Sequence, residues 1–155
     1  MQRRDTPISV RWIVLAMLVS CGSPEKEAYD RLARELNPLI VEMAPVAARL
    51  LATPNSDTNA TINTCWAADT ALRQLREVSF DSDYVYPEPP GVSLSFMAKQ
   101  LLDGRKLACP LLDTPRQLAA CAEFCRGYWI EMMDEVDRLR KNGRKYGIQI
   151  ASLRP

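Results

Sequence analysis

Hydrophobic residues recur every three or four positions along most of the chain after residue 23, which is the spacing of one face of an α-helix. The first such stripe predicts a helix that begins with a Ser23 cap and Pro24 in its first turn. Its apolar positions are Tyr29, Leu32, Leu36, Ile40, Met43, Ala47 and Leu50. Because Pro38 and Pro45 fall inside the stripe, we expect a kink or a break there.

Two shorter stripes follow the turn-forming residues 53–59. The first predicts a second helix and consists of Ile62, Cys65, Trp66, Asp69, Leu72 and Leu75. Residues 81–93 hold three prolines and a glycine, so they are predicted to form a loop. The next stripe predicts a third helix that ends at Gly104, and consists of Leu94, Met97 and Leu101.

The clearest helical pattern lies near the end of the chain. Thr114, Pro115 and Gln117 form a capping box with proline at the first helical position, and Asn142-Gly143 is a stop signal. The apolar stripe between them consists of Leu118, Cys121, Cys125, Tyr128, Met132, Val136 and Leu139. From Pro115 to Lys141 this helix would be about 40 Å long. Only 146–150 shows a possible alternation of the kind seen in strands.

Four helical segments joined by shorter connections predict an all-α fold, an antiparallel bundle of about four helices. A chain of 155 residues has room for one domain, and a hydrophobic content of 47% is that of an ordinary globular protein. We expect the bundle to occupy residues 24–142 and residues 143–155 to form a C-terminal tail.

The N-terminus has the three parts of an export signal. Arg3, Arg4 and Arg11 form a basic region, residues 12–19 are apolar, and small residues follow from Ser20. The apolar run is far shorter than the roughly 20 residues that span a bilayer as a helix. We therefore interpret residues 1–20 as a signal peptide that is removed.

The end of this signal, Leu18-Val19-Ser20-Cys21, resembles the lipobox of bacterial lipoproteins. The resemblance covers only the first 21 residues, and an ordinary cleaved signal is the alternative. It implies cleavage between Ser20 and Cys21 and attachment of a diacylglyceryl group to Cys21. It therefore implies a cell-envelope protein held to the membrane by lipid, with residues 21–23 as a short tether. Gly22 after the cysteine favours the outer membrane over the inner membrane, with the domain facing the periplasm or the cell surface.

Cysteine arithmetic agrees with the lipoprotein interpretation. The chain has five cysteines, an odd number for an exported protein, and assigning Cys21 to lipid leaves an even set. In an oxidising compartment the remaining four favour two disulfides. In an up-down-up-down bundle these four cysteines would meet at one end, which makes Cys109–Cys121 with Cys65–Cys125 the preferred pairing. The swapped pairing and a four-thiolate zinc site are the alternatives, and we expect no metal.

Several chemistries are excluded. The chain has no histidine, which removes histidine-based nucleophilic sites, histidine metal cages and the commonest general base. Without the three arginines and one aspartate of residues 1–20, the formal charge falls from +1 to −1, so nucleic acid is not an expected partner. The carboxylates of Glu131, Asp134, Glu135 and Asp137 could in principle cleave glycosides, but a solvated face with Arg138 and Lys141 is the simpler interpretation. Asp69 lies in an apolar stripe and needs a partner, such as an arginine from another helix.

A basic cluster ends the last helix and is a possible binding surface for lipid phosphate or an acidic protein. It consists of Arg138, Arg140, Lys141, Arg144 and Lys145. The simpler interpretation is that cations suit a helix C-terminus. Taken together, the sequence predicts a non-enzymatic, membrane-anchored domain without cofactors that binds a partner protein or an envelope component. A carrier of a small apolar ligand is the first alternative, and a carboxylate-based hydrolase is the second.

Overall fold

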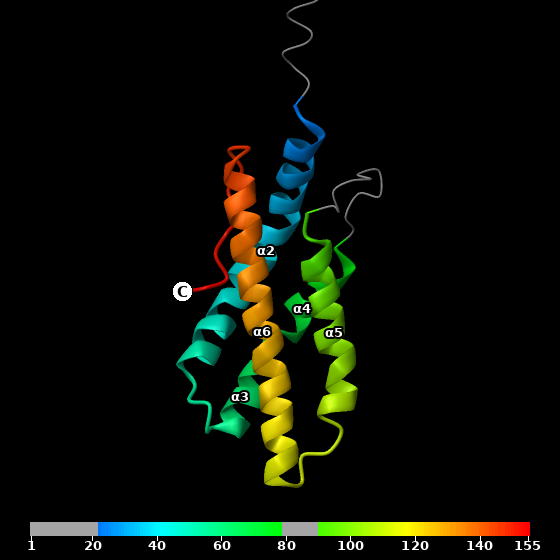
Figure 1. The fold of residues 1–155 in the computed structure, drawn as a ribbon, viewed down its shortest axis with the longest axis vertical. Coiled ribbons are helices and arrows are strands. Elements are labelled where there is room, and N and C mark those ends of the chain that lie inside the picture. The colour runs from blue at the N-terminus through cyan, green and yellow to red at the C-terminus, as the bar shows by residue number, and fades with distance from the viewer. Residues whose placement is uncertain (1–21, 79–89) are drawn as a thin grey trace, which may run out of the picture.

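The computed structural model describes residues 22–78 and 90–155, and this part of the chain is helical, without strands (Figure 1). Its five helices are α2 (Pro24–Ala52), α3 (Thr58–Cys65), α4 (Asp69–Glu77), α5 (Val92–Ala108) and α6 (Pro115–Arg144). The predicted all-α class is therefore confirmed. The export signal and the lipobox lie outside the described residues.

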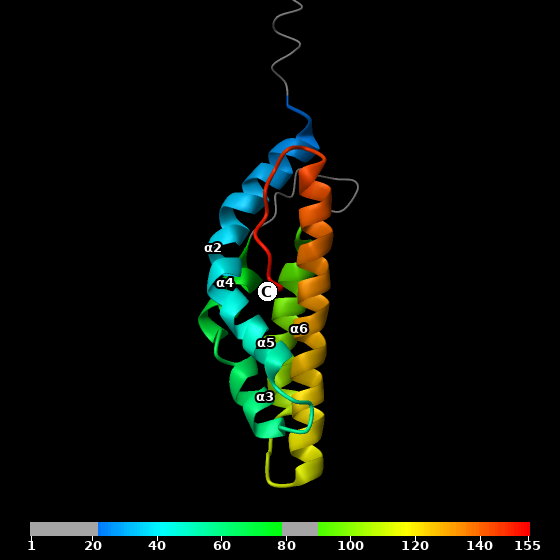
Figure 2. The same ribbon diagram turned by 90° about the vertical axis from the view of Figure 1, so that its left-hand side faces the viewer.

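Helix α2 begins where the sequence predicts and runs without a break through both internal prolines. The Ser23 hydroxyl accepts a hydrogen bond from the Lys26 amide at 3.2 Å. Pro38 and Pro45 are exposed, so the carbonyl groups that lose their helical partners can take water instead. The expected break is wrong, and the helix is bowed instead (Figure 2).

The second predicted helix is two helices. α3 ends at Cys65, and a turn at 66–68 precedes α4, which begins at Asp69. The turn is closed by a hydrogen bond from the Asp69 amide to the Trp66 carbonyl at 3.2 Å. Because the interruption is short and holds neither proline nor glycine, the apolar period continues across it and hides it in the sequence.

The other boundaries differ by a few residues. α5 continues past Gly104 to Ala108, and α6 continues past the Asn142-Gly143 stop to Arg144. The capping box at the start of α6 is confirmed, since the Thr114 hydroxyl accepts from the Gln117 amide at 3.2 Å and the Gln117 side chain accepts from the Thr114 amide at 3.0 Å. At about 45 Å, α6 is the longest helix of the described chain and contacts α2, α3 and α5.

The C-terminal segment is part of the packed domain. After a turn at Gly147, where φ is +74°, the chain runs back between α2 and α6 (Figure 2). Ile150 and Leu153 are buried in the core. The possible strand at 146–150 is wrong: residues 146 and 147 belong to the turn, and residues 148–150 form no strand. The residues expected as a tail therefore cover one side of the helices.

Candidate functional site

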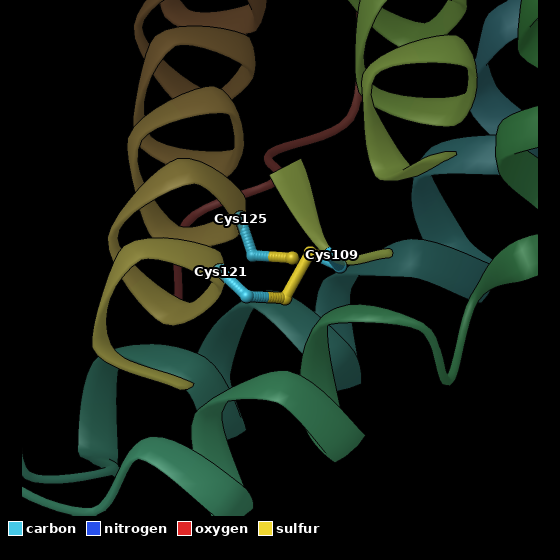
Figure 3. A group of neighbouring side chains, drawn as sticks. All are labelled: Cys109, Cys121 and Cys125. Carbon is cyan, nitrogen blue, oxygen red and sulfur yellow. A yellow bond between two sulfur atoms is a disulfide. The ribbon is translucent and has the colours of Figure 1, made fainter. Parts of the chain in front are cut away.

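Sulfur atoms from three helices meet near the N-terminal end of α6. Cys109 caps the end of α5, while Cys121 and Cys125 lie four residues apart on α6 and so share one helix face. Cys109 and Cys121 form a disulfide with an S–S distance of 2.05 Å, and Cys125 points toward it (Figure 3). The first bridge of the preferred pairing is therefore present.

Cys65 and Cys125 remain as buried thiols. Burial raises the pKa of the Cys65 thiol well above its usual range, and a hydrogen bond with Cys125 raises that pKa further. The two thiols are thus adjacent. The second bridge, Cys65–Cys125, is not formed and stays a prediction.

This sulfur cluster, Cys65, Cys109, Cys121 and Cys125, is also where a soft metal ion would bind. The sulfur atoms of Cys109, Cys121 and Cys125 lie within 4.8 Å of one another. However, a structural zinc site takes four thiolate or imidazole ligands, and the disulfide has already removed two of the four sulfurs. The closed bridge therefore favours a structural role for the cluster.

The basic cluster divides into paired and exposed members. Arg138 binds the buried Glu135 carboxylate at 2.6 and 2.7 Å, and Arg140 bonds both Asp137 and the Ile150 carbonyl. Arg138 thus pairs within α6, whereas Arg140 also joins α6 to the C-terminal segment. Three cationic side chains of the cluster remain exposed at the end of α6, namely Lys141, Arg144 and Lys145.

The end of α6 lies directly against the start of α2. The rings of Tyr29 and Tyr146 stack with their centroids 5.4 Å apart. Burial raises the pKa of Tyr29, and a hydrogen bond with the Asn142 side chain opposes that rise. A Cβ at Gly143 would lie 3.5 Å from the Tyr29 ring and 3.2 Å from the Ile148 carbonyl oxygen, so the close approach favours glycine there. Both ends lie together in both views (Figures 1 and 2).

The carboxylates weighed as catalytic groups are held by arginines. Asp137 accepts from Arg140 at 3.1 Å and from Arg154 at 3.0 Å, and Arg154 also pairs with Asp134. The simpler interpretation of the sequence was a solvated face with Arg138 and Lys141 instead. Arg154 could not be anticipated because it lies in the segment expected to be a tail. These pairs hold the C-terminal segment on α6.

Asp69 has the kind of partner that the sequence called for. Its carboxylate binds Arg73 of α4 at 2.7 Å, and Arg105 of α5 lies 3.7 Å from its other oxygen. That second oxygen is buried without a hydrogen bond. Arg105 in turn lies over the Trp66 ring, 4.3 Å from the centroid. The group joins the α3–α4 turn to α5 and is best explained as structural.

Apolar side chains are exposed where α5 connects to α6. Leu107 is 85% exposed, Leu111 58% and Leu112 40%, and the disulfide of Cys109 lies among them in the sequence. This leucine loop is at the opposite end of the domain from the start of α2 (Figure 1). Three exposed leucines within six residues of sequence make this loop a candidate surface for binding another protein.

Surface depressions lie elsewhere in the described part of the chain, among them a pair beside α2, α3 and α6. One, of about 470 Å³, is lined by α3 and α6 residues that include Thr58, Ala122 and Arg126. The other, of about 800 Å³, lies between α2 and the C-terminal segment and includes Asn37, Val41 and Ile148. Both are open to solvent, unlike the enclosed apolar cavity that a carrier of a small ligand would need.

Arg126 is an important residue that the sequence did not single out. Its guanidinium donates to the Leu50 and Thr53 carbonyls at 3.0 and 2.9 Å and to the Thr61 hydroxyl at 3.0 Å. It thereby caps the end of α2 and joins it to α3 and α6. Its position on the helix was readable from the sequence, but partners 65 to 76 residues away were not.

The comparisons with known proteins give no family for this chain: no family model, no curated protein and no solved structure matches it.

Proposed function

We propose that this protein is a bacterial lipoprotein of the cell envelope whose helical domain binds a partner protein or an envelope component without catalysis. Cleavage between Ser20 and Cys21 leaves Cys21 as the lipidated N-terminus, with the outer membrane favoured over the inner. The observation that best supports this proposal is the start of α2 at Pro24. The anchoring residue is then separated from a capped helix by Gly22 and Ser23 alone.

This short connection has a physical consequence for function. Two residues span at most about 7 Å when extended, so the domain would stay against the membrane. Two or three acyl chains give stable anchoring, whereas one gives marginal residence. In the described part of the chain no helix is long and apolar enough to cross a membrane.

We also infer that α3 and α4 together take the place of one helix in an antiparallel bundle of four. α2 packs on both α3 and α4, while α4 also packs on α5 and α3 on α6. In this arrangement the two ends of the bundle differ: one lies beside the proposed anchor and the other carries the leucine loop.

The leucine loop supports a protein partner. Leu107, Leu111 and Leu112 are exposed at the end remote from the start of α2, where a protein that is not at the membrane surface could reach them. The disulfide at Cys109 restrains this loop, so that the loop loses less conformational entropy when a partner binds.

The anchor is tested with Cys21→Ala. We expect loss of labelling by a fatty-acid probe and release of the protein from membranes. Gly22→Ala is the matched control, since a Cβ there would meet only the Glu27 side chain at 3.7 Å or more. Persistent labelling of the Cys21→Ala protein would refute the lipoprotein proposal.

The partner is tested with a photo-reactive amino acid at Leu107 or Leu111 in the native envelope. We expect a discrete cross-linked protein from these positions and none from Lys99, which is exposed on α5 outside the loop. Equal cross-linking from all three positions would argue against the leucine loop as the binding surface.

A further inference from the structure

Three exposed cations and the membrane anchor lie at the same end of the domain. Lys141, Arg144 and Lys145 lie at the end of α6. The stacking of Tyr29 on Tyr146 fixes that end against the first turns of α2. The sequence alone placed the cluster at the end of a helix; the structure adds that this is the end from which the chain leaves toward Cys21 (Figure 1).

These three cations are not used by the fold. Within residues 22–78 and 90–155 no ion pair involves them, whereas Arg138 and Arg140 are paired with Glu135 and Asp137. The helix C-terminus accounts for some preference for cations. It does not account for three exposed ones next to two that the domain has already paired.

The charges around this end leave a cationic excess. The first turn of α2 has Glu25, Lys26 and Glu27, for a balance of −1. Asp30 is paired with Arg34 at 3.1 Å. Against this balance stand the three cations of α6, so the exposed groups at this end sum to a positive charge although residues 21–155 together are slightly acidic.

We propose that this end of the domain is a docking surface for anionic lipid headgroups of the membrane that anchors Cys21. The inference rests on the proposed function, because the lipid on Cys21 brings the surface to the membrane. The cluster consists of Lys141, Arg144 and Lys145, and its ligands are the phosphate groups of the bilayer.

Distances favour the membrane over an acidic protein as the occupant. The tether of Gly22 and Ser23 spans at most about 7 Å. Tyr29, which marks the level of Tyr146, is five residues into α2 and thus about 7.5 Å along its axis. Arg144 and Lys145 are therefore within about 15 Å of the bilayer at full extension, and Lys141, three residues earlier on α6, is about 4.5 Å farther. Arg144 and Lys145 come within the Debye length of about 8 Å when the tether folds back.

The test measures acetylation of lysines in the lipidated protein, reconstituted in vesicles of phosphatidylglycerol with phosphatidylcholine or of phosphatidylcholine alone. We expect acetylation of Lys141 and Lys145 to be about fivefold slower in the anionic vesicles at low salt. The difference should disappear at high salt. Lys99 and Lys106, on α5, are internal controls whose rates should not change.

Two matched double variants extend the test. Arg144→Gln/Lys145→Gln should abolish most of the protection at Lys141. Lys106→Gln/Arg116→Gln removes the same charge at the other end of the domain and should preserve that protection. Equal Lys141 rates in both kinds of vesicle would overturn the proposal. Protection in native envelopes but not in anionic vesicles would also overturn it and would indicate an acidic protein.

Failure of the underlying proposal would give a different result. If Cys21 carried no lipid, the protein would not float with vesicles of either composition. Flotation without headgroup-dependent protection would leave the anchor standing and remove only the docking surface.

Discussion

The indole of Trp129 donates a hydrogen bond to the backbone carbonyl of Cys65 at 3.1 Å, with both residues fully buried. Cys65 is the last residue of α3, where carbonyl groups lack partners within the helix. Trp129 thus satisfies one of these groups from the middle of α6. This bond permits the chain to turn at 66–68 inside the core, next to the sulfur cluster.

We expect Trp129→Phe to lower the free energy of unfolding by about 3 kcal/mol. The loss combines a buried carbonyl without its donor with the cavity left by the smaller ring. Urea denaturation measures the change. Tyr128→Phe, which removes a hydroxyl from the adjacent half-buried ring, is the control and should change stability by less than about 0.5 kcal/mol. A similar loss in both variants would show that the indole bond has no special weight.

The disulfide pattern can be read by mass spectrometry of the protein purified without reductant. Trypsin leaves Cys121 and Cys125 on one peptide, but Glu123 lies between them, so cleavage after glutamate separates the two cysteines. We expect Cys109 linked to Cys121. We also expect Cys65 linked to Cys125, because adjacent buried thiols in an oxidising compartment can close without moving the backbone far.

Opening the observed bridge should be costly. Cys109 and Cys121 are 12 residues apart, and a bridge of that span contributes about 3 kcal/mol. Cys109→Ser with Cys121→Ser should lower stability by about this amount in denaturant. Four free thiols in the non-reduced, alkylated protein would contradict the assignment of these cysteines to disulfides.

The raised pKa of Cys65 should lower the stability of the reduced protein at alkaline pH. Burial raises this pKa in the folded state, so the unfolded chain releases the proton first as the pH rises. The stabilising contribution is complete below the unfolded pKa of about 8.5 and is lost as the pH rises toward the folded value. One pH unit above 8.5, the loss is about 1.4 kcal/mol.

The measurement is urea unfolding in reductant at pH 7.5 and 9.5, for the wild type and for Cys65→Ala. The comparison uses the pH slopes rather than the absolute stabilities, since the alanine also leaves a cavity. We expect the wild type to lose about 1.4 kcal/mol more than the variant over this interval. Parallel slopes would show that the Cys65 thiol titrates normally.

Much of the helical content could be predicted because it depends on local chemistry. The start of α2 is set by Ser23 and Pro24, and that of α6 by the Thr114 capping box, and both signals lie within four residues. Apolar period also identified the buried face of α6, including Cys121, Cys125 and Met132. The turn between α3 and α4 was not predicted, because it barely disturbs the three- and four-residue spacing of the apolar positions.

The candidate sites were readable only in part. The residue types alone showed that the end of α6 is basic. Which cations form ion pairs depends on the fold, since Arg138 pairs with Glu135 and Arg140 pairs with Asp137. The cysteines were predicted to converge, since helix order brings their segments to one end. Which of the sulfur atoms form a disulfide depends on side-chain geometry, and the spacing of the cysteines in the sequence does not determine that geometry.

The packing of the C-terminal segment was the largest departure from the sequence prediction, and a single side chain on α2 does much to hold it. Asn37 accepts a hydrogen bond from the Ala151 amide at 2.8 Å and donates one to the Gln149 carbonyl at 3.1 Å. These bonds join residues more than 110 positions apart. The side-chain amide of Asn37 thus provides this segment with the pair of hydrogen bonds that a neighbouring strand would otherwise make.

We expect Asn37→Ala to lower stability by about 1–2 kcal/mol, because both backbone groups of the segment lose their partner. Hydrogen exchange at Ala151 should accelerate by more than global unfolding explains, since the segment can then detach alone. Asn37→Asp keeps the acceptor for Ala151 but places a second oxygen against the Gln149 carbonyl. It should therefore protect Ala151 better than alanine does. Asn55→Ala, at an exposed position between α2 and α3, is the control, and an equal acceleration there would rule out a specific role for Asn37.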